Sequence, residues 1–278
     1  MKKIIVPIDF SEHSEFALKT AAKLAKRNNA EVLALHMLEL SDAILTRTDT
    51  EQQQKAFFYL ELAKRRFDEF LEKDYLQGVS VTPIVKHFKV FSEVNDVAKE
   101  HDADLIVMGS HGVSGFKEFF VGSNTERVVR HADIPVLVVK NDVANVNFDT
   151  VVFVSNFEEE NVKPYLNASK MFESLGSKMK LLYVNLPNEH FKSSTEIEGR
   201  IAEFLKKADG DLGKINDVAY QADYSVEQGV INFANKVGAD LIAVPTHGRT
   251  GIAHFFGGSI GEDIANHASL PVMTFKID

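Results

Sequence analysis

Cysteine is absent from this chain of 278 residues. Its absence excludes disulfide bonds, thiolate metal ligands and thiol nucleophiles together. Long apolar runs are lacking too, because no run approaches the ~18 residues that a membrane-spanning helix needs. The N-terminal segment MKKIIVPIDF has too few apolar residues before Asp9 to form the core of a signal peptide. These absences predict a soluble, cytoplasmic protein with no membrane contact.

Concentrated positive charge is also missing. The chain has 31 lysines and arginines against 40 aspartates and glutamates, a formal net charge of -9, and no segment gathers basic residues without acidic ones among them. Nucleic-acid binding usually needs a basic patch or stripe. We therefore expect no nucleic-acid partner, and an anionic ligand would have to be held by local groups.

An internal repeat is the most informative feature that is present. Residues 103–140 align with residues 239–276 at a constant offset of 136 without a gap, and 17 of the 38 positions are identical. The starts of the two halves also correspond, at an offset of 147. The extra residues of the first half fall in or near an amphipathic helical segment at residues 48–74. We predict two domains, residues 1–143 and 144–278, each of ordinary domain size.

Short β-rich runs alternate with helical patterns in both halves. A helix is expected after Ser11, a plausible N-cap, because apolar residues recur there at helical spacing. Such alternation predicts βαβ units, a mainly parallel sheet and the α/β class. The expected strands are 4–8, 31–38, 79–85, 104–109 and 135–140 in the first half, and 150–154, 178–184, 217–223, 240–244 and 271–277 in the second.

One loop of the first half is rich in glycine. The fourth expected strand is followed by Gly109-x2-Gly112-x9-Gly122-Ser123. Glycine permits positive φ and close approach of backbone N–H groups to an anion, and the N-terminus of a helix starting at Ser123 favours phosphate. The loop has no Gly-Lys-Ser/Thr sequence, so no lysine is supplied for phosphate chemistry. Binding is therefore better supported than catalysis.

An acid stands where a second ligand contact is expected. Asp9 follows the first strand and suits a ribose hydroxyl, whereas the glycine loop follows the fourth strand and suits phosphates. Ligands of open α/β sheets bind beyond the carboxyl ends of strands where the strand order reverses. If the first and fourth strands are neighbours at that point, the sequence predicts a nucleotide.

These motifs resemble the universal stress protein family in its tandem, two-domain form, over both halves almost end to end. The glycine signature, the valine-rich strand PVLVV after it and Asp9 resemble the ATP-binding branch of the family. The resemblance implies two Rossmann-like (adenine nucleotide alpha hydrolase-like) domains, each with a five-stranded parallel sheet in the order 3-2-1-4-5 and helices on both faces. Family members commonly pair through the fifth strand. A tandem chain would then be an intramolecular pseudo-dimer, and a homodimer stays open.

The resemblance also implies a ligand and its contacts. The ligand is ATP, with Mg2+ or Mn2+ bound through its phosphates. The residues implied for adenine and ribose are Pro7, Asp9, Met37 and Met108, and those implied for the phosphates are Gly109, Gly112, Gly122, Ser123 and Asn124.

The second half departs from this pattern at two positions. Pro245 replaces the first glycine, which removes one N–H and fixes φ near ~-65°. Asn156 replaces the acid and keeps hydrogen-bonding capacity without the charge, while Arg249 adds a cation. We expect one competent ATP site, in the first half, and a second that is degenerate or serves another ligand.

Simpler interpretations exist for most of these residues. Asp9 and Ser123 could serve mainly as helix caps, since Ser123-x-x-Glu126 and Ser259-x-x-Glu262 are capping-box patterns. The repeated loop histidines, His111 and His247, are more simply structural than general bases. His36 is expected to be a half-buried core residue. The pair Phe119 and Phe120, with its repeat Phe255 and Phe256, is expected to serve in packing or at an interface rather than to stack on a base.

Three functions follow in order of preference. The first is an ATP-binding stress-response module whose nucleotide occupancy changes the surface shown to partners, with at most slow hydrolysis and no assigned catalytic residue. The second is a nucleotide hydrolase or transferase that uses the same pocket with the ion as Lewis acid. The third is a nucleotide-free interaction module with decayed sites.

Overall fold

The computed structural model describes residues 1–38, 50–87, 93–110, 123–187, 191–247 and 268–277. Several residues singled out in the sequence lie outside this set: Gly112, Gly122, His111, Phe119, Phe120, Arg249, Phe255, Phe256, Ser259 and Glu262. The side chains of Ser123, Asn124, Glu126 and His247 also lie outside it.

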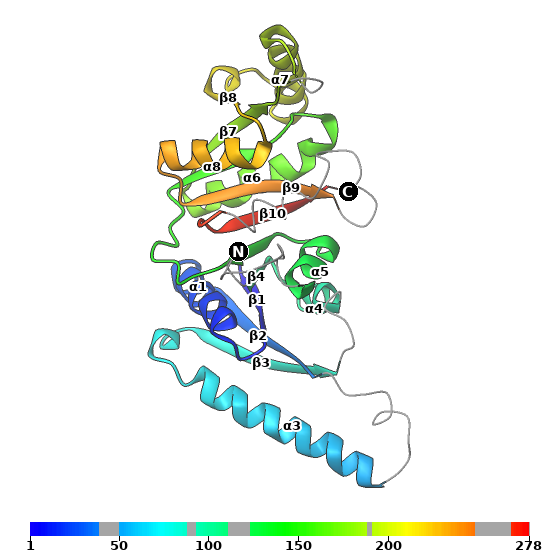
Figure 1. The fold of residues 1–278 in the computed structure, drawn as a ribbon. Coiled ribbons are helices and arrows are strands. Elements are labelled where there is room, and N and C mark those ends of the chain that lie inside the picture. The colour runs from blue at the N-terminus through cyan, green and yellow to red at the C-terminus, as the bar shows by residue number, and fades with distance from the viewer. Residues whose placement is uncertain (39–49, 88–92, 111–122, 188–190, 248–267, 278) are drawn as a thin grey trace.

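The described strands form one ten-stranded sheet in the order β3-β2-β1-β4-β5-β10-β9-β6-β7-β8 (Figure 1). The predicted α/β class with a mostly parallel sheet is confirmed. The strands of the first half are β1 (Lys3–Ile8), β2 (Glu31–Leu38), β3 (Ser80–His87), β4 (Leu105–Gly109) and β5 (Val136–Val139). Those of the second half are β6 (Thr150–Val154), β7 (Lys178–Asn185), β8 (Ala219–Ala222), β9 (Leu241–His247) and β10 (Val272–Ile277).

Helices cover both faces of the sheet. The buried side chains divide by strand alternation, so that one face packs against α1, α3, α6 and α7, and the other against α4 and α5 in the first half and α8 in the second. The α-helices are α1 (Glu12–Asn28), α3 (Thr50–Leu71), α4 (Val94–Glu100), α5 (Ser123–His131), α6 (Val162–Leu175), α7 (Ser194–Ala208) and α8 (Val226–Val237). Short 3-10 turns lie at η1 (Asp74–Leu76), η3 (Glu159–Asn161) and η5 (Ile215–Asp217). Among the described helices, none combines the length and apolar character needed to cross a bilayer.

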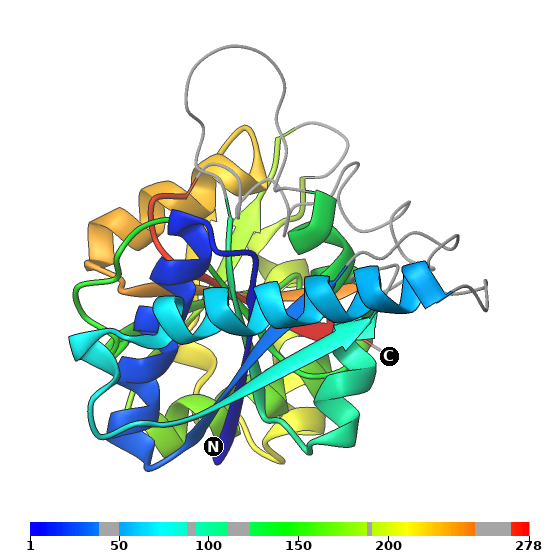
Figure 2. The same ribbon diagram turned by 90° about the horizontal axis from the view of Figure 1, so that it is seen from below.

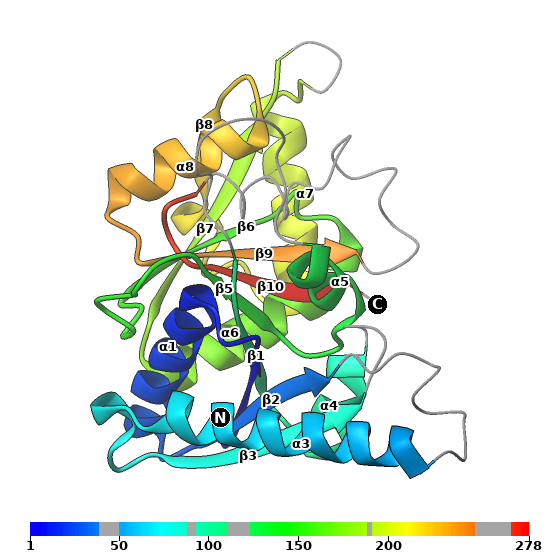
Figure 3. The ribbon, with the colours of Figure 1, turned by 60° about the horizontal axis from the view of Figure 1, so that its bottom comes forward.

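The two halves meet along β5 and β10, which are antiparallel and lie side by side in Figure 3. Their register joins Leu137 to Met273, and both of these side chains belong to one buried core that spans the two halves. Lys276 extends this seam by an ion pair with Asp133 of the first half. The halves therefore share a continuous backbone ladder.

Helix α1 shows why the repeat folds twice in the same way. Ser11 caps the helix by accepting a hydrogen bond from the Ser14 N–H, as predicted, and the helix ends at Asn29 in the left-handed region with φ 50°. Its counterpart α6 ends at Gly176, also left-handed with φ 71°. Phe10 and Phe157, at equivalent positions after β1 and β6, share positive φ values of 65° and 57°. The two halves thus share unusual backbone conformations at equivalent positions as well as a common apolar pattern.

Candidate functional site

The carboxyl ends of β1 and β4 form the point where the strand order reverses. β1 pairs with β4 at Ile4↔Leu105 and Ile5↔Ile106, whereas its pairing with β2 continues to Ile8↔His36. The pairing between β1 and β4 therefore stops before either strand ends, and within the described residues their carboxyl ends lie next to each other without being paired. Ligands of open α/β sheets bind at such a switch point.

Three of the residues implied for adenine and ribose share one face of the sheet. Met108 is buried in the core beneath α4 and α5, and Met37 of β2 packs against the edge of the same core. Pro7 is buried and alternates with Ile5, a member of that core, so its side chain lies on this face too. The structure therefore brings Pro7, Met37 and Met108 onto adjacent strands at the switch point.

Asp9 lies just past β1 with an exposed side chain. Its Oδ1 accepts hydrogen bonds from the Ser11 N–H at 3.0 Å and the Ser11 hydroxyl at 2.6 Å. Partial burial acts to raise the pKa of Asp9, but the hydrogen bonds from the Ser11 hydroxyl and N–H help to outweigh it and hold the pKa below its ordinary value. Asp9 is thus an anion at neutral pH and supports the start of α1, so the capping interpretation describes part of its role.

Gly109 is required by packing. A Cβ placed on Gly109 would lie 2.1 Å from the His13 carbonyl oxygen and 2.4 Å from the His13 carbonyl carbon, so only glycine lets α1 approach the end of β4 this closely. Gly109 does not need positive φ, since it is absent from the positive-φ glycines of the described residues. The explanation by a left-handed backbone is therefore wrong at this position, and close approach of two backbones takes its place.

Two residues that the motif did not single out complete the end of β4. Ser110 is buried, its N–H donates to the Val139 carbonyl at 2.9 Å, and its hydroxyl has no hydrogen-bond partner among the described residues. Thr125 in the first turn of α5 donates from its hydroxyl to the Gly109 carbonyl at 3.2 Å. The sequence does carry a signal for Thr125, because the two halves differ at this position and the repeat has Gly261 in its place.

Helix α5 begins at Ser123, as the glycine motif predicted. Thr125 fixes the first turn of this helix to the end of β4, so the backbone of Ser123 and Asn124 is held near the switch point. The N–H groups of a first helical turn lack partners within the helix and can bind an anion.

The second half repeats the turn but changes its chemistry. Asn156 Oδ1 accepts from the Glu158 N–H at 3.0 Å, as Asp9 does from Ser11, and also from the Asn161 side-chain amide at 2.6 Å. The Asn156 oxygen is therefore occupied by a second side chain. Asn161 is fully buried.

Pro245 lies inside β9, where it pairs with Phe275 of β10. Ile242 donates to the Pro271 carbonyl on the β10 side, and alternate residues donate on the same side, so the position of Pro245 faces β6. The β6 ladder ends at Phe153↔Ala243, before the proline is reached. Proline is thus tolerated here without the loss of a ladder hydrogen bond.

His36 is a core residue, as the simpler interpretation held. Its Nδ1 lies 2.8 Å from the Ile8 carbonyl oxygen, and its ring packs against Phe10 and Phe67. The second half has Tyr183 in contact with Phe157 at the corresponding place.

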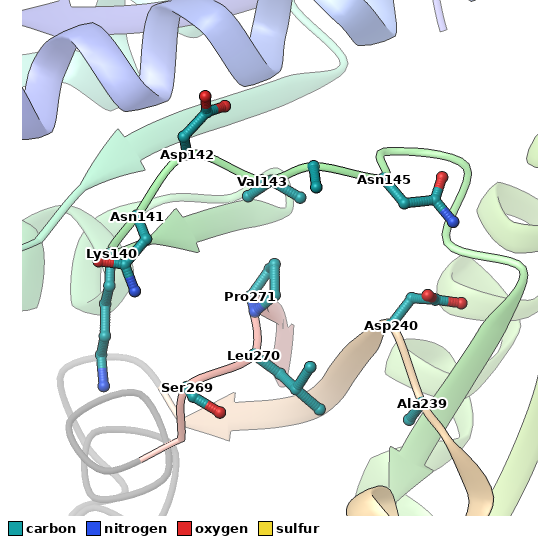
Figure 4. Close-up of a pocket in the computed structure, with 11 residues that line it drawn as sticks. Lys140, Asn141, Asp142, Val143, Asn145, Ala239, Asp240, Ser269, Leu270 and Pro271 are labelled. Atoms are coloured by element: carbon teal, nitrogen blue, oxygen red, sulfur yellow. The ribbon is translucent and has the colours of Figure 1, made fainter.

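A cavity of about 310 Å³ lies at the junction of the halves, under the segment 140–145, rather than at the switch point (Figure 4). The Lys140 ammonium donates to the Ala268 carbonyl at 2.7 Å, and burial lowers the pKa of Lys140 to about 8. Within the described ranges, no group of three or more His, Asp or Glu side chains is arranged to hold a metal ion.

The model of the universal stress protein family matches this chain twice, over residues 1–140 and 148–276. The chain belongs to this family. Two universal stress proteins of Methanocaldococcus jannaschii are each 32% identical to it, over 149 and 153 residues, each covering 50% of this chain and 82% and 94% of their own length. Single-domain relatives thus match one half of a tandem universal stress protein.

One solved structure aligns with the whole chain. A universal stress protein from Archaeoglobus fulgidus matches with a TM-score of 0.65 and 21% identity, covering 99% of this chain and 98% of that one. At this identity the likeness concerns the fold, which is the tandem arrangement of both halves.

Proposed function

We propose that the first half of this universal stress protein binds ATP at the carboxyl ends of β1 and β4, and that the second half does not. The observation that carries the proposal is the pairing of Asp9, anionic and exposed, with the buried hydroxyl of Ser110 at one switch point. Buried polar groups usually have a partner, and a partner for Ser110 supplied by a ligand would satisfy it.

The residues that would hold ATP divide by chemistry. Pro7, Met37 and Met108 supply an apolar surface for adenine, and the Asp9 carboxylate can accept from ribose hydroxyls. The phosphates would lie at the glycine loop, to which Gly112 and Gly122 belong, and at the N-terminus of α5 with Ser123 and Asn124. ATP would bring Mg2+ or Mn2+ bound to its phosphates.

Nucleotide binding in this proposal serves signalling rather than turnover. The glycine loop lacks the Gly-Lys-Ser/Thr sequence that places a lysine on a transferred phosphate, and among the described residues His36 is engaged in the core. ATP would order the surface around α5 and β4, which partners of a stress response could then distinguish from the free form.

The segment 141–147, which the family model leaves unmatched, contains the proposed domain boundary between residues 143 and 144.

The two halves are also proposed to act as an intramolecular pseudo-dimer, supported by the β5–β10 ladder. A single chain then contains the surface that two single-domain copies would form.

Titration with ATP and Mg2+ by calorimetry tests the proposal. We expect saturable binding to the wild type, strong loss in Asp9→Ala, and unchanged binding in Asn156→Ala, its matched control in the second half. Multiple turnovers of ATP per chain per minute would contradict the signalling role and favour a hydrolase. Absence of binding in the wild type would contradict the site itself.

A further inference from the structure

A second cavity, of about 400 Å³, lies at the opposite end of the first half, where the strands begin. It is lined by the residues that precede or open β1, β2 and β3 and by the last turn of α1. Its polar lining residues are Lys2, Lys3, Lys26, Asn29, Glu31 and Ser80. In Figure 2 the chain's N-terminus marks this end of β1. The nucleotide proposed above would lie at the other ends of the same strands.

The charge of this cavity runs against that of the protein. Three lysines face one glutamate in its lining, and beside it the Asp104 carboxylate accepts from the backbone N–H groups of Lys2 and Lys3, in a chain whose formal net charge is -9. Glu31 is engaged by the Thr82 hydroxyl at 2.6 Å, and Lys3 donates to the His101 carbonyl at 2.8 Å. The carboxyl end of α1 adds only about half a negative charge. The cavity is therefore net positive.

Several donors of the cavity are unused. The ammonium groups of Lys2 and Lys26 and the side chains of Asn29 and Ser80 form no hydrogen bond or ion pair with any residue that the structure describes. Each ammonium has three protons to donate, and the hydroxyl and amide add neutral donors. Such a mixture suits a phosphate group, which offers several acceptor oxygens and up to two negative charges.

The second half shows that the fold does not need these charges. At the offset of 147, Lys2 corresponds to Asp149, Lys26 to Glu173 and Glu31 to Lys178, so each charge is reversed.

A lysine in the last turn of a helix often serves the helix dipole. Helix α6, the counterpart of α1, has no basic residue in its last turn. Lys26 is therefore not required to end a helix at this place in the fold.

We propose that this cavity binds a small organic phosphate monoester, with Lys2 and Lys26 opposing its dianion and Ser80 and Asn29 donating to its oxygens. The volume is within the usual range of ligand sites, ~300–1,000 Å³, and exceeds what a phosphate group alone would fill. The site belongs to the first half only and lies apart from the switch point. A phosphorylated metabolite bound there would contact the amino ends of strands in the same sheet whose carboxyl ends form the proposed nucleotide site.

Nuclear magnetic resonance on the full chain tests this proposal at residue level. Glycerol 3-phosphate and inorganic phosphate are titrated separately at constant ionic strength, while the amide signals of Ala30 and Gly78, which line the cavity, are followed. We expect saturable shifts of both signals. A lower dissociation constant for glycerol 3-phosphate assigns the site to esters, whereas equal constants assign it to the phosphate group alone and overturn the ester proposal.

The matched variants are Lys26→Glu and Lys236→Glu. Lys236 is exposed in the last turn of α8, so the second variant makes the same charge change at a helix end outside the cavity. A charged hydrogen bond is worth about 1.5–3 kcal/mol, so Lys26→Glu should weaken binding roughly 10- to 100-fold. Equal weakening by both variants would reduce the effect to overall charge and overturn the proposal.

Two further checks keep the result clear. Lys2→Ala, near the chain terminus, is expected to weaken binding without affecting folding. Shifts confined to the switch point, with none at Ala30 or Gly78, would place the phosphate in the nucleotide site and contradict the cavity site. Because Asp9→Ala leaves the lysine cavity unchanged, retained binding in that variant separates this proposal from the ATP proposal.

Discussion

The two halves share a backbone but differ in how the fourth strand ends. In the first half β4 stops at Gly109, against the backbone of α1, and α5 is tied to it by Thr125. In the second half β9 continues past Pro245 and pairs with β10 as far as His247↔Ile277. In the first half the ladder between the fourth and fifth strands ends at Gly109↔Val139, where a ligand is expected. In the second half the corresponding ladder continues for two more residues beyond Pro245.

The chain that faces β4 and β9 differs in the same sense. Helix α1 begins at Glu12 as a regular helix, whereas η3 occupies Glu159–Asn161 before α6 begins. The close approach that Gly109 permits cannot be repeated at Pro245, which has a Cβ. A ligand loop thus depends on how tightly the first helix packs against the fourth strand, as well as on the loop's own glycines.

The largest expected effect comes from giving Gly109 a side chain. Gly109→Ala places a Cβ 2.1 Å from the His13 carbonyl oxygen, so either α1 or β4 must move. Such overpacking costs about 3 kcal/mol. Urea unfolding measures the loss, and ATP binding should fall with it. Gly199→Ala in α7, where a Cβ meets no atom within 4 Å, is the control and should be neutral or stabilising.

The second largest effect is expected from Asp9→Asn, which gives the first half the side chain that the second half has at Asn156. This variant should bind ATP roughly 10- to 100-fold more weakly, because a charged hydrogen bond becomes a neutral one. Calorimetry at fixed Mg2+ measures the change. Asn156→Asp is the reverse substitution, and it should not create a site because Pro245 remains. If Asp9→Asn binds ATP as the wild type does, the charge is irrelevant to the difference between the halves.

Acid should remove a contribution of Asp9 to stability. Its folded pKa is lowered from the ordinary value of 3.8, so the contribution is full above that value and is lost as the pH falls through the folded pKa. The unfolding free energies of wild type and Asp9→Asn should therefore converge in strong acid. A difference that stays constant through this range would contradict the hydrogen bonds assigned to Asp9.

The contact of Thr125 predicts a smaller effect. Thr125→Val keeps the shape but removes the donor to the Gly109 carbonyl, for a loss of about 1 kcal/mol in the free energy of unfolding. Thr125→Ser keeps the hydroxyl and should be closer to the wild type. Equal losses in the two variants would show that the methyl group contributes as much as the hydrogen bond, and a loss in Thr125→Ser alone would contradict the role of the hydrogen bond.

The smallest expected effect concerns the seam. Asp133 accepts from Lys276, but the repeat has Ser269 near Lys140, so Ser269→Asp would make the seam symmetric. Burial lowers the pKa of Lys140 to about 8, so unfolding stability should rise as the pH increases from there towards the ordinary value of 10.5. The variant should raise this pKa, flatten that rise and add about 0.5 kcal/mol at neutral pH. Unfolding curves at pH 7 and pH 10 compare the two.

Much of the fold could be predicted from the sequence, because the repeat doubled each signal. The strands that end at Ile8 and Val154, and the cap at Ser11, lie where alternation and spacing indicated. Packing across the sheet was harder, because the need for a bare Cα at Gly109 arises from His13, which is distant in sequence. The Ser110 hydroxyl, which has no hydrogen-bond partner among the described residues, gives no sequence signal, since a serine next to glycine is ordinary in a loop.

The most direct test of the central claim is to count the nucleotide that the protein carries. The wild type is saturated with ATP and Mg2+, separated from free ligand and denatured, and the released adenine nucleotide is measured by mass spectrometry against the amount of chain. One nucleotide per chain, lost in Asp9→Ala and kept in Asn156→Ala, is the result that the difference between the halves predicts. Two per chain would show that the extended β9 with Pro245 still binds, and would contradict the account.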